Sequence, residues 1–198
     1  MMENYSMRLV PVALVLSTAL LAACSSGDDT DAVATDPALA EGASGSAETV
    51  VATAPLAAAD GAPRGEARLV AIGDRVELRV ADTGLPAGNL GMHLHMSGKC
   101  EGPKFESAGA HLNPGNRKHG SENPDGSHLG DLPNLTVAAD GSGNAVAGLA
   151  EMRSGAEQAL FDADGTAIVI HAKADDYKTD PSGDSGDRIA CGVMTRAG

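Results

Sequence analysis

All six histidines of this 198-residue chain lie between residues 93 and 171, and this clustering constrains the fold more than any other feature. His93 and His95 are two positions apart, so on a β-strand both imidazoles point to the same side and can bind one metal ion. Any single histidine is explained without a metal, as a surface or core residue. Taken together with one nearby aspartate, they indicate a metal site whose donors the fold must gather: His93, His95, His111, His119, His128, Asp131 and His171.

Two long polar segments contain or adjoin these histidines. Residues 98–133 and 172–187 are rich in Gly, Pro, Asn and Asp and have few apolar residues. Loops of this length inside a compact domain are either disordered or functional. Because the first contains three of the histidines and the second begins directly after His171, function is the better explanation.

Short apolar segments separated by turn residues make up most of the remaining chain. In residues 76–80 apolar and charged residues alternate strictly, which predicts a strand with one buried and one wet face. Asp140-Gly141 and Asp164-Gly165 have the composition of hairpin turns, and no window of about twelve residues keeps a helical period. We therefore predict an all-β, antiparallel sandwich or barrel with strands near residues 49–57, 66–71, 76–81, 135–138, 145–149, 166–171 and 188–194.

The amino-terminal segment has the pattern of an export signal. Residues 9–23 form an apolar run that is too short to predict a membrane-spanning helix. Leu21-Ala22-Ala23, directly before Cys24, resembles a bacterial lipoprotein signal. That resemblance implies lipidation of Cys24 as the first mature residue, and an exported protein at the periplasmic or cell-envelope face that touches the membrane only through its lipid anchor. The alternative is an ordinary signal peptide followed by an incidental cysteine.

The segment after Cys24 consists mainly of Ala, Gly, Ser and Asp and has no aromatic residue, Lys or Arg. It buries too little apolar surface to offset the entropy of ordering, which predicts a flexible tether, with a pro-segment as the alternative. The expected organisation is a lipoprotein signal peptide (1–23), an acidic tether (24–47) and a folded domain (48–198). The net charge of −13 argues against nucleic acid as a partner.

Cys100 and Cys191 are the two cysteines that remain if Cys24 is lipidated. An even pair in an oxidising compartment is expected to form a disulfide. Such a bond would close a loop that spans most of the folded domain. The alternative is two separate buried thiols.

Six motifs, in order and with matching spacing, resemble those of the copper/zinc superoxide dismutase family. The resemblance covers residues 48–196 and implies an antiparallel Greek-key β-barrel or sandwich, immunoglobulin-like, with two long functional loops. Leu90 and Met92 stand where the family often has histidine and aromatic residues. The motifs are Gly91-Met92-His93-Leu94-His95, Ser107-Ala108-Gly109-Ala110-His111-Leu112-Asn113-Pro114, Lys118-His119-Gly120, His128-Leu129-Gly130-Asp131-Leu132-Pro133-Asn134, His171-Ala172-Lys173-Ala174-Asp175-Asp176 and Arg188-Ile189-Ala190-Cys191-Gly192-Val193.

The resemblance also implies a role for each site residue. Asp175 would accept hydrogen bonds from one copper ligand and one zinc ligand, and Arg188 would hold the anionic substrate at the copper. Their alternatives are a solvated loop acid and a surface arginine. Cys100 and Cys191 fall where the family has its disulfide. The implied ligands are His93, His95, His111 and His171 for copper and His111, His119, His128 and Asp131 for zinc, with the His111 imidazolate bridging the two metals.

For activity, the resemblance implies dismutation of superoxide anion to dioxygen and hydrogen peroxide. Copper would cycle between two oxidation states, while zinc would keep His111 in position. Two alternatives stay open: a non-enzymatic exported copper/zinc-binding or copper-carrier protein on the same fold, and a copper-only enzyme, against which His119, His128 and Asp131 argue. A monomer and a homodimer are both compatible with the sequence.

Overall fold

The computed structural model describes residues 47–149 and 151–198. The predicted signal peptide, Cys24 and residues 25–46 of the predicted tether lie outside the described residues. Within the described part, no helix combines the length and the apolar character needed to cross a membrane. The elements are β1 (Glu48–Ala57), β2 (Pro63–Ile72), β3 (Arg75–Thr83), β4 (Gly88–Leu90), β5 (Met92–His95), a 3-10 turn (Glu106–Ala108), β6 (Leu135–Val137), β7 (Ser142–Gly148), α1 (Arg153–Leu160), β8 (Ala167–His171), β9 (Arg188–Val193) and β10 (Thr195–Arg196).

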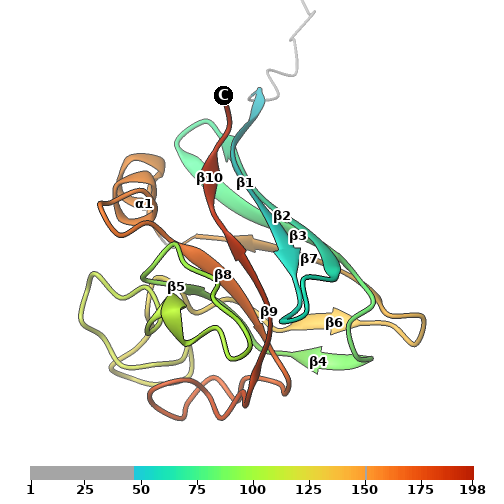
Figure 1. Ribbon diagram of the computed structural model, residues 1–198. Helices are drawn as coiled ribbons and strands as arrows, with labels where there is room; N and C mark the ends of the chain where they lie inside the picture. Colours follow the sequence, from blue (N-terminus) through green and yellow to red (C-terminus); the bar gives the residue numbers. More distant parts are fainter. Residues whose placement is uncertain (1–46, 150) are drawn as a thin grey trace, which may run out of the picture. The chain divides into compact units, whose positions relative to one another are not determined.

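The strands form one antiparallel sheet that closes nearly into a barrel (Figure 1). Their order is β4-β6-β7-β3-β2-β1-β9-β8-β5, with β10 beside β1. β4 and β5 stand at the two ends of this order but are separated in sequence only by Gly91, so one stretch of chain pairs with β6 and then with β8. β7 lies beside β3 although three strands intervene in sequence, as a Greek-key connection requires. The predicted all-β antiparallel fold is confirmed.

Alternation of apolar and charged residues places β3 in the barrel wall as predicted. Val76, Leu78 and Val80 are buried on the inner face. On the outer face Arg79 forms an ion pair with Glu48 of β1 at 2.8 Å. The barrel interior is therefore filled by the residues that the period-2 pattern selects.

The structure differs from the sequence prediction at short elements. α1 has only eight residues, fewer than a window in which a helical period is recognisable, and it buries Ala156 and Leu160. Because α1 lies between β7 and β8, Asp164-Gly165 ends a helix–strand connection, so the predicted hairpin turn at this position is wrong. β10 has two residues and was not predicted.

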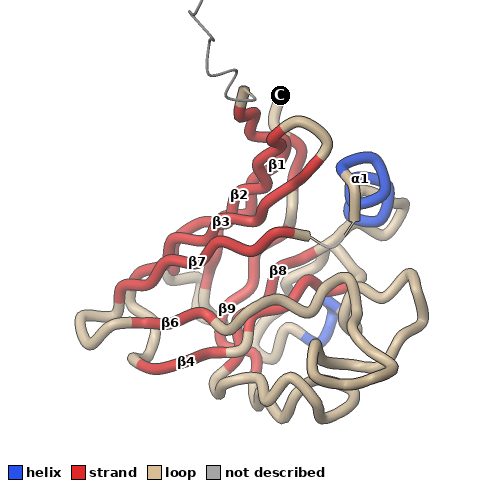
Figure 2. The backbone as a smooth tube through the Cα atoms, turned by 180° about the vertical axis from the view of Figure 1, so that it is seen from behind, coloured by secondary structure: helices blue, strands red, loops and turns tan. Residues whose placement is uncertain are grey.

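The two long polar segments lack strands of their own and gather on the β8–β9 side of the barrel, away from β3 and β7 (Figure 2). The first runs from the end of β5 to β6 and the second from β8 to β9. Since both begin or end at strands that are neighbours in the sheet, they come together in space.

The predicted disulfide between Cys100 and Cys191 is confirmed. The two Cα atoms are 5.7 Å apart, and the bond joins residues separated by 91 positions. It fastens the first long loop to β9, where Cys191 is buried.

Removing this bond is expected to lower the free energy of unfolding by about 4–5 kcal/mol, because the unfolded chain regains the freedom of a very long loop. The comparison is urea unfolding of the metal-free chain with and without the double substitution Cys100→Ser/Cys191→Ser. Equal unfolding midpoints for the two proteins would contradict this expectation.

Candidate metal centre

Backbone pairing places β5 between β8 and the first long loop. On one edge, His93 and His95 of β5 stand opposite Val169 and Ala167 of β8. On the other edge, the Leu94 N–H donates to the Gly130 carbonyl at 2.9 Å, and its carbonyl accepts from Leu112 at 2.8 Å. A Cβ on Gly130 would collide with the Leu94 carbonyl oxygen, so this approach requires glycine.

These hydrogen bonds bring predicted site residues opposite each other. His95 pairs with His111, and His93 pairs with Asp131, in isolated antiparallel bridges. Main-chain pairing alone therefore brings these loop residues to the candidate metal centre.

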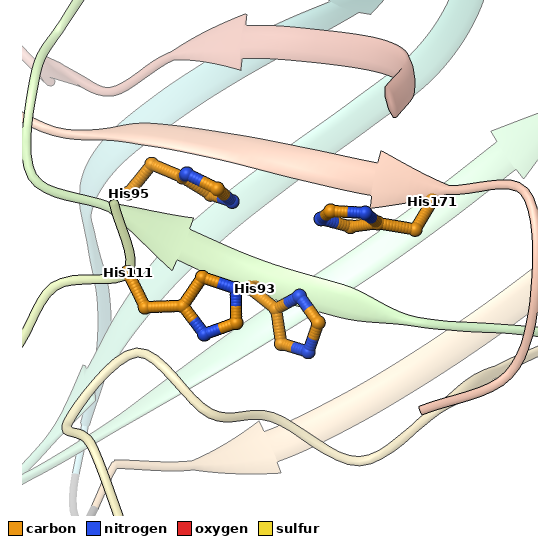
Figure 3. Close-up of side chains that lie close together, drawn as sticks. All are labelled: His93, His95, His111 and His171. Carbon is orange, nitrogen blue, oxygen red and sulfur yellow. The ribbon is translucent and has the colours of Figure 1, made fainter. Parts of the chain in front are cut away.

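Four imidazoles converge in a first cluster (Figure 3). His93 and His95 come from β5, His171 comes from the end of β8, and His111 comes from the loop. One nitrogen from each lies within 4.8 Å of the others, and all four residues are buried. The nitrogens that have no hydrogen-bond partner among the described residues are one from each ring: His93 Nδ1, His95 Nε2, His111 Nε2 and His171 Nε2.

Main-chain carbonyls orient two of these rings. The His95 Nδ1–H donates to the Gly109 carbonyl at 2.9 Å, and the His171 Nδ1–H donates to the Gly186 carbonyl at 3.1 Å. A carbonyl can only accept, so the proton lies on Nδ1 and the Nε2 lone pair points into the cluster. Sequence reasoning missed both carbonyls, since main-chain acceptors leave no residue-type signal.

Burial keeps three rings of the first cluster, those of His95, His111 and His171, neutral. It lowers the pKa of His95 to about 2, that of His171 to about 3 and that of His111 to about 4, and neighbouring histidines contribute in the same direction. Neutral imidazole is the form that binds a metal ion. These three rings therefore present their lone pairs at neutral pH without first losing protons.

A second cluster forms around Asp131. Its Oδ1 lies 2.9 Å from His111 Nδ1 and 3.0 Å from the Nδ1 atoms of His119 and His128. Its Oδ2 accepts hydrogen bonds from the backbone N–H groups of Gly120 and His128. Although burial opposes it, these hydrogen bonds hold the pKa of Asp131 far below its usual value. Three nitrogens and one carboxylate oxygen match the four ligands of a closed zinc site.

His111 belongs to both clusters. Its Nε2 is among the unpartnered nitrogens of the first cluster, and its Nδ1 faces Asp131 in the second. The two nitrogens of one imidazole point outward on different sides of the ring, so a single side chain joins the two groups.

Asp175 joins the clusters a second time, through its carboxylate. Oδ2 lies 2.7 Å from His93 Nε2 and Oδ1 lies 3.0 Å from His119 Nε2, with the carboxylate fully buried. The Asn134 amide makes two hydrogen bonds to the backbone of Asp175, which fixes the loop at this point. Burial alone would lower the pKa of His119, but Asp131 and Asp175, one at each ring nitrogen, raise it to about 9.

Arg188 begins β9 directly opposite His171 in the sheet. Its Nη1 and Nη2 donate to the carbonyls of Phe105 and Gly109, each at 2.7 Å. The Gly109 carbonyl is the one that also orients His95. The half-buried guanidinium lines a cavity of about 580 Å³ together with Lys104, Glu106 and Asp187.

Comparison with known proteins agrees with this architecture. The family model described as copper/zinc superoxide dismutase (SODC) matches residues 63–194. Superoxide dismutase-like protein YojM from Bacillus subtilis is 47% identical over 111 residues, which cover 55% of this chain and 57% of that protein. Superoxide dismutase (Cu-Zn) from Caulobacter vibrioides is 42% identical over 147 residues, covering 72% and 84%.

A solved structure, that of a SOD-like protein from Bacillus subtilis, superposes with a TM-score of 0.65 at 37% identity and covers 72% of this chain and 97% of that one. The matched region contains every residue of both clusters, Asp175 and Arg188. The chain therefore belongs to the copper/zinc superoxide dismutase family.

Proposed function

We propose that this chain converts superoxide to dioxygen and hydrogen peroxide, with copper in the first cluster, zinc in the second and His111 between them. The observation that carries the proposal is the set of four buried imidazole nitrogens that have no hydrogen-bond partner in the described chain, beside a separate set of three nitrogens and a carboxylate oxygen. Leaving such buried polar atoms unpaired is unfavourable. A metal ion bound by the four nitrogens would remove this unfavourable free energy.

The donor types support the choice of metals. Imidazole nitrogens suit copper, and copper supplies one-electron redox chemistry when bound. Zinc takes imidazole and carboxylate ligands, four in a closed site, as the second cluster offers. A metal store would need neither the shared His111 nor a half-buried arginine beside the first cluster, and this favours the enzyme over the carrier.

The residues around the clusters have three tasks in this reaction. Asp175 and the Gly109 and Gly186 carbonyls hold the rings in one tautomer and orientation. The His111 Nε2 is placed to accept a proton and return it, because its other nitrogen stays fixed in the second cluster. Arg188 uses two of its N–H groups on carbonyls, which leaves the others to bind the anion.

His111→Ala is expected to remove the link between the clusters and one donor from each. The substituted chain should bind zinc at least about 10–100-fold more weakly, the loss typical of removing a residue that only hydrogen-bonds to a ligand, and should lose most activity. The barrel should still fold because His111 lies in a loop. Metal content per chain, circular dichroism and superoxide consumption before and after chelation are the measurements. Two tightly bound metals with wild-type activity in this variant would contradict the shared role, and a wild-type chain with both metals but no activity would favour the store.

Arg188→Gln is expected to reduce kcat/KM for superoxide about tenfold at low ionic strength, because a positive charge at the first cluster attracts the anion. Arg188→Lys should retain part of the rate, since it keeps the charge but loses the paired donors. The rate should fall with added salt in the wild type and much less so in Arg188→Gln. Copper and zinc contents serve as the control and should be equal in all three proteins.

Export and lipidation form a separate part of the proposal and depend on the sequence of the first 24 residues. The Cys100–Cys191 disulfide supports an oxidising compartment. Cys24→Ser is expected to move the protein from the membrane fraction to the soluble fraction, because its only predicted membrane contact is the lipid. Continued membrane association of this variant would contradict lipidation.

A further inference from the structure

A second cavity, of about 880 Å³, opens beside the second cluster. It lies between the first long loop, the connection from α1 to β8 and the second long loop. His111 and His128 are among its lining residues, whereas Arg188 is not. It shares no lining residue with the cavity at Arg188, so the two cavities are separate.

His128 is the second-cluster residue that stands between this cavity and Asp131. The residue is only 8% exposed, and its Nδ1 lies 3.0 Å from Asp131 Oδ1. Its Nε2 makes no hydrogen bond with any residue that the structure describes, and the ring lines the cavity. A cation in the cavity is thus directly beside two of the four donor residues, His111 and His128.

Unpaired acidic residues dominate the charge of the cavity wall. Asp180 is neutralised by Lys118 at 2.9 Å. The carboxylates of Asp125, Asp162 and Asp164 form no ion pair within the described chain, and they face one unpaired cation, Arg117. A concave wall with excess negative charge concentrates cations in front of it.

We propose that this cavity is the access route by which a divalent cation reaches the second cluster. The proposal rests on the assignment of that cluster as the zinc site. The wall aspartates act by raising the local cation concentration, and His111 and His128 stand at the inner end, where the cation meets its ligands. Because the aspartates are not ligands in this scheme, they change the rates of uptake and of release by the same factor and leave the equilibrium affinity unchanged.

The test variant is Asp162→Asn/Asp164→Asn in the metal-free, disulfide-bonded chain. Asparagine keeps the Oδ1 acceptor that Asp162 offers to the N–H groups of Asp164 and Gly165, so the local turn is retained. Cobalt(II), added at less than one ion per chain, is followed by its visible absorption in stopped flow. We expect the association rate to fall about three- to tenfold at low ionic strength, with the difference disappearing at high salt and the dissociation constant unchanged.

Two further variants make the result specific. Glu106→Gln/Asp187→Asn removes the same charge from the other cavity and should leave the uptake rate at its wild-type value. Arg117→Gln removes the opposing charge and should speed up uptake. Equal slowing by both double variants, or no slowing by either, would overturn the route, and so would a weaker equilibrium affinity in the test variant. Failure of the wild-type chain to bind cobalt(II) would instead overturn the zinc assignment itself.

Discussion

Backbone pairing along the second edge of β5 is the constraint on which both clusters depend. A strand that carried only His93 and His95 would present two donors, too few for either metal. Hydrogen bonds from Leu94 to Leu112 and Gly130 bring His111 and Asp131 to the same level as these donors. The glycine at position 130 allows this approach, since a side chain there would collide with the β5 carbonyl. The site is therefore an extension of the sheet by loop residues, and its geometry follows from main-chain register.

The two clusters differ in whether the protein itself provides partners for the ring nitrogens. In the second cluster the Asp131 carboxylate faces all three ring nitrogens, so these nitrogens have a polar partner even without a metal. In the first cluster four buried nitrogens face one another with no hydrogen-bond partner among residues 47–149 and 151–198, and burial keeps three of the rings from taking up protons. Each unsatisfied buried group costs about 1–3 kcal/mol. Binding of a metal ion to these nitrogens removes this unfavourable contribution to folding. Metal binding at the first cluster is therefore expected to raise the free energy of unfolding.

The position of Arg188 depends on a covalent constraint. The carbonyls that hold Arg188 belong to the segment between Phe105 and Gly109, which is otherwise a loop with one 3-10 turn. Cys100 precedes this segment and is bonded to Cys191, three residues after Arg188 on β9. The disulfide thus ties the arginine's acceptors to the arginine's own strand. Because Gly109 also accepts from His95, the position of the guanidinium and the orientation of a first-cluster ring are set by one carbonyl.

Much of this protein was predictable from the chain itself. Alternation in residues 76–80 predicted the face that β3 buries, the even cysteine pair predicted the disulfide, and the motif order led to the family. These features are local in sequence or depend on residue type. The short helix α1 was missed because its eight residues carry too little periodic signal, and the hairpin predicted at Asp164-Gly165 failed for the same reason.

Only the tertiary structure determined how the donors meet. Sequence resemblance named seven ligands, but the bridges from His95 to His111 and from His93 to Asp131 join residues far apart in the chain, and no local pattern encodes that register. The carbonyls of Gly109 and Gly186 are main-chain groups, which residue type does not reveal. The side-chain amide of Asn134 meets the backbone of Asp175, 41 positions away, only in the folded chain. The sequence by itself thus determined which side chains are available as ligands, whereas the closed sheet determined their distances, because long-range hydrogen bonds form only when the whole barrel does.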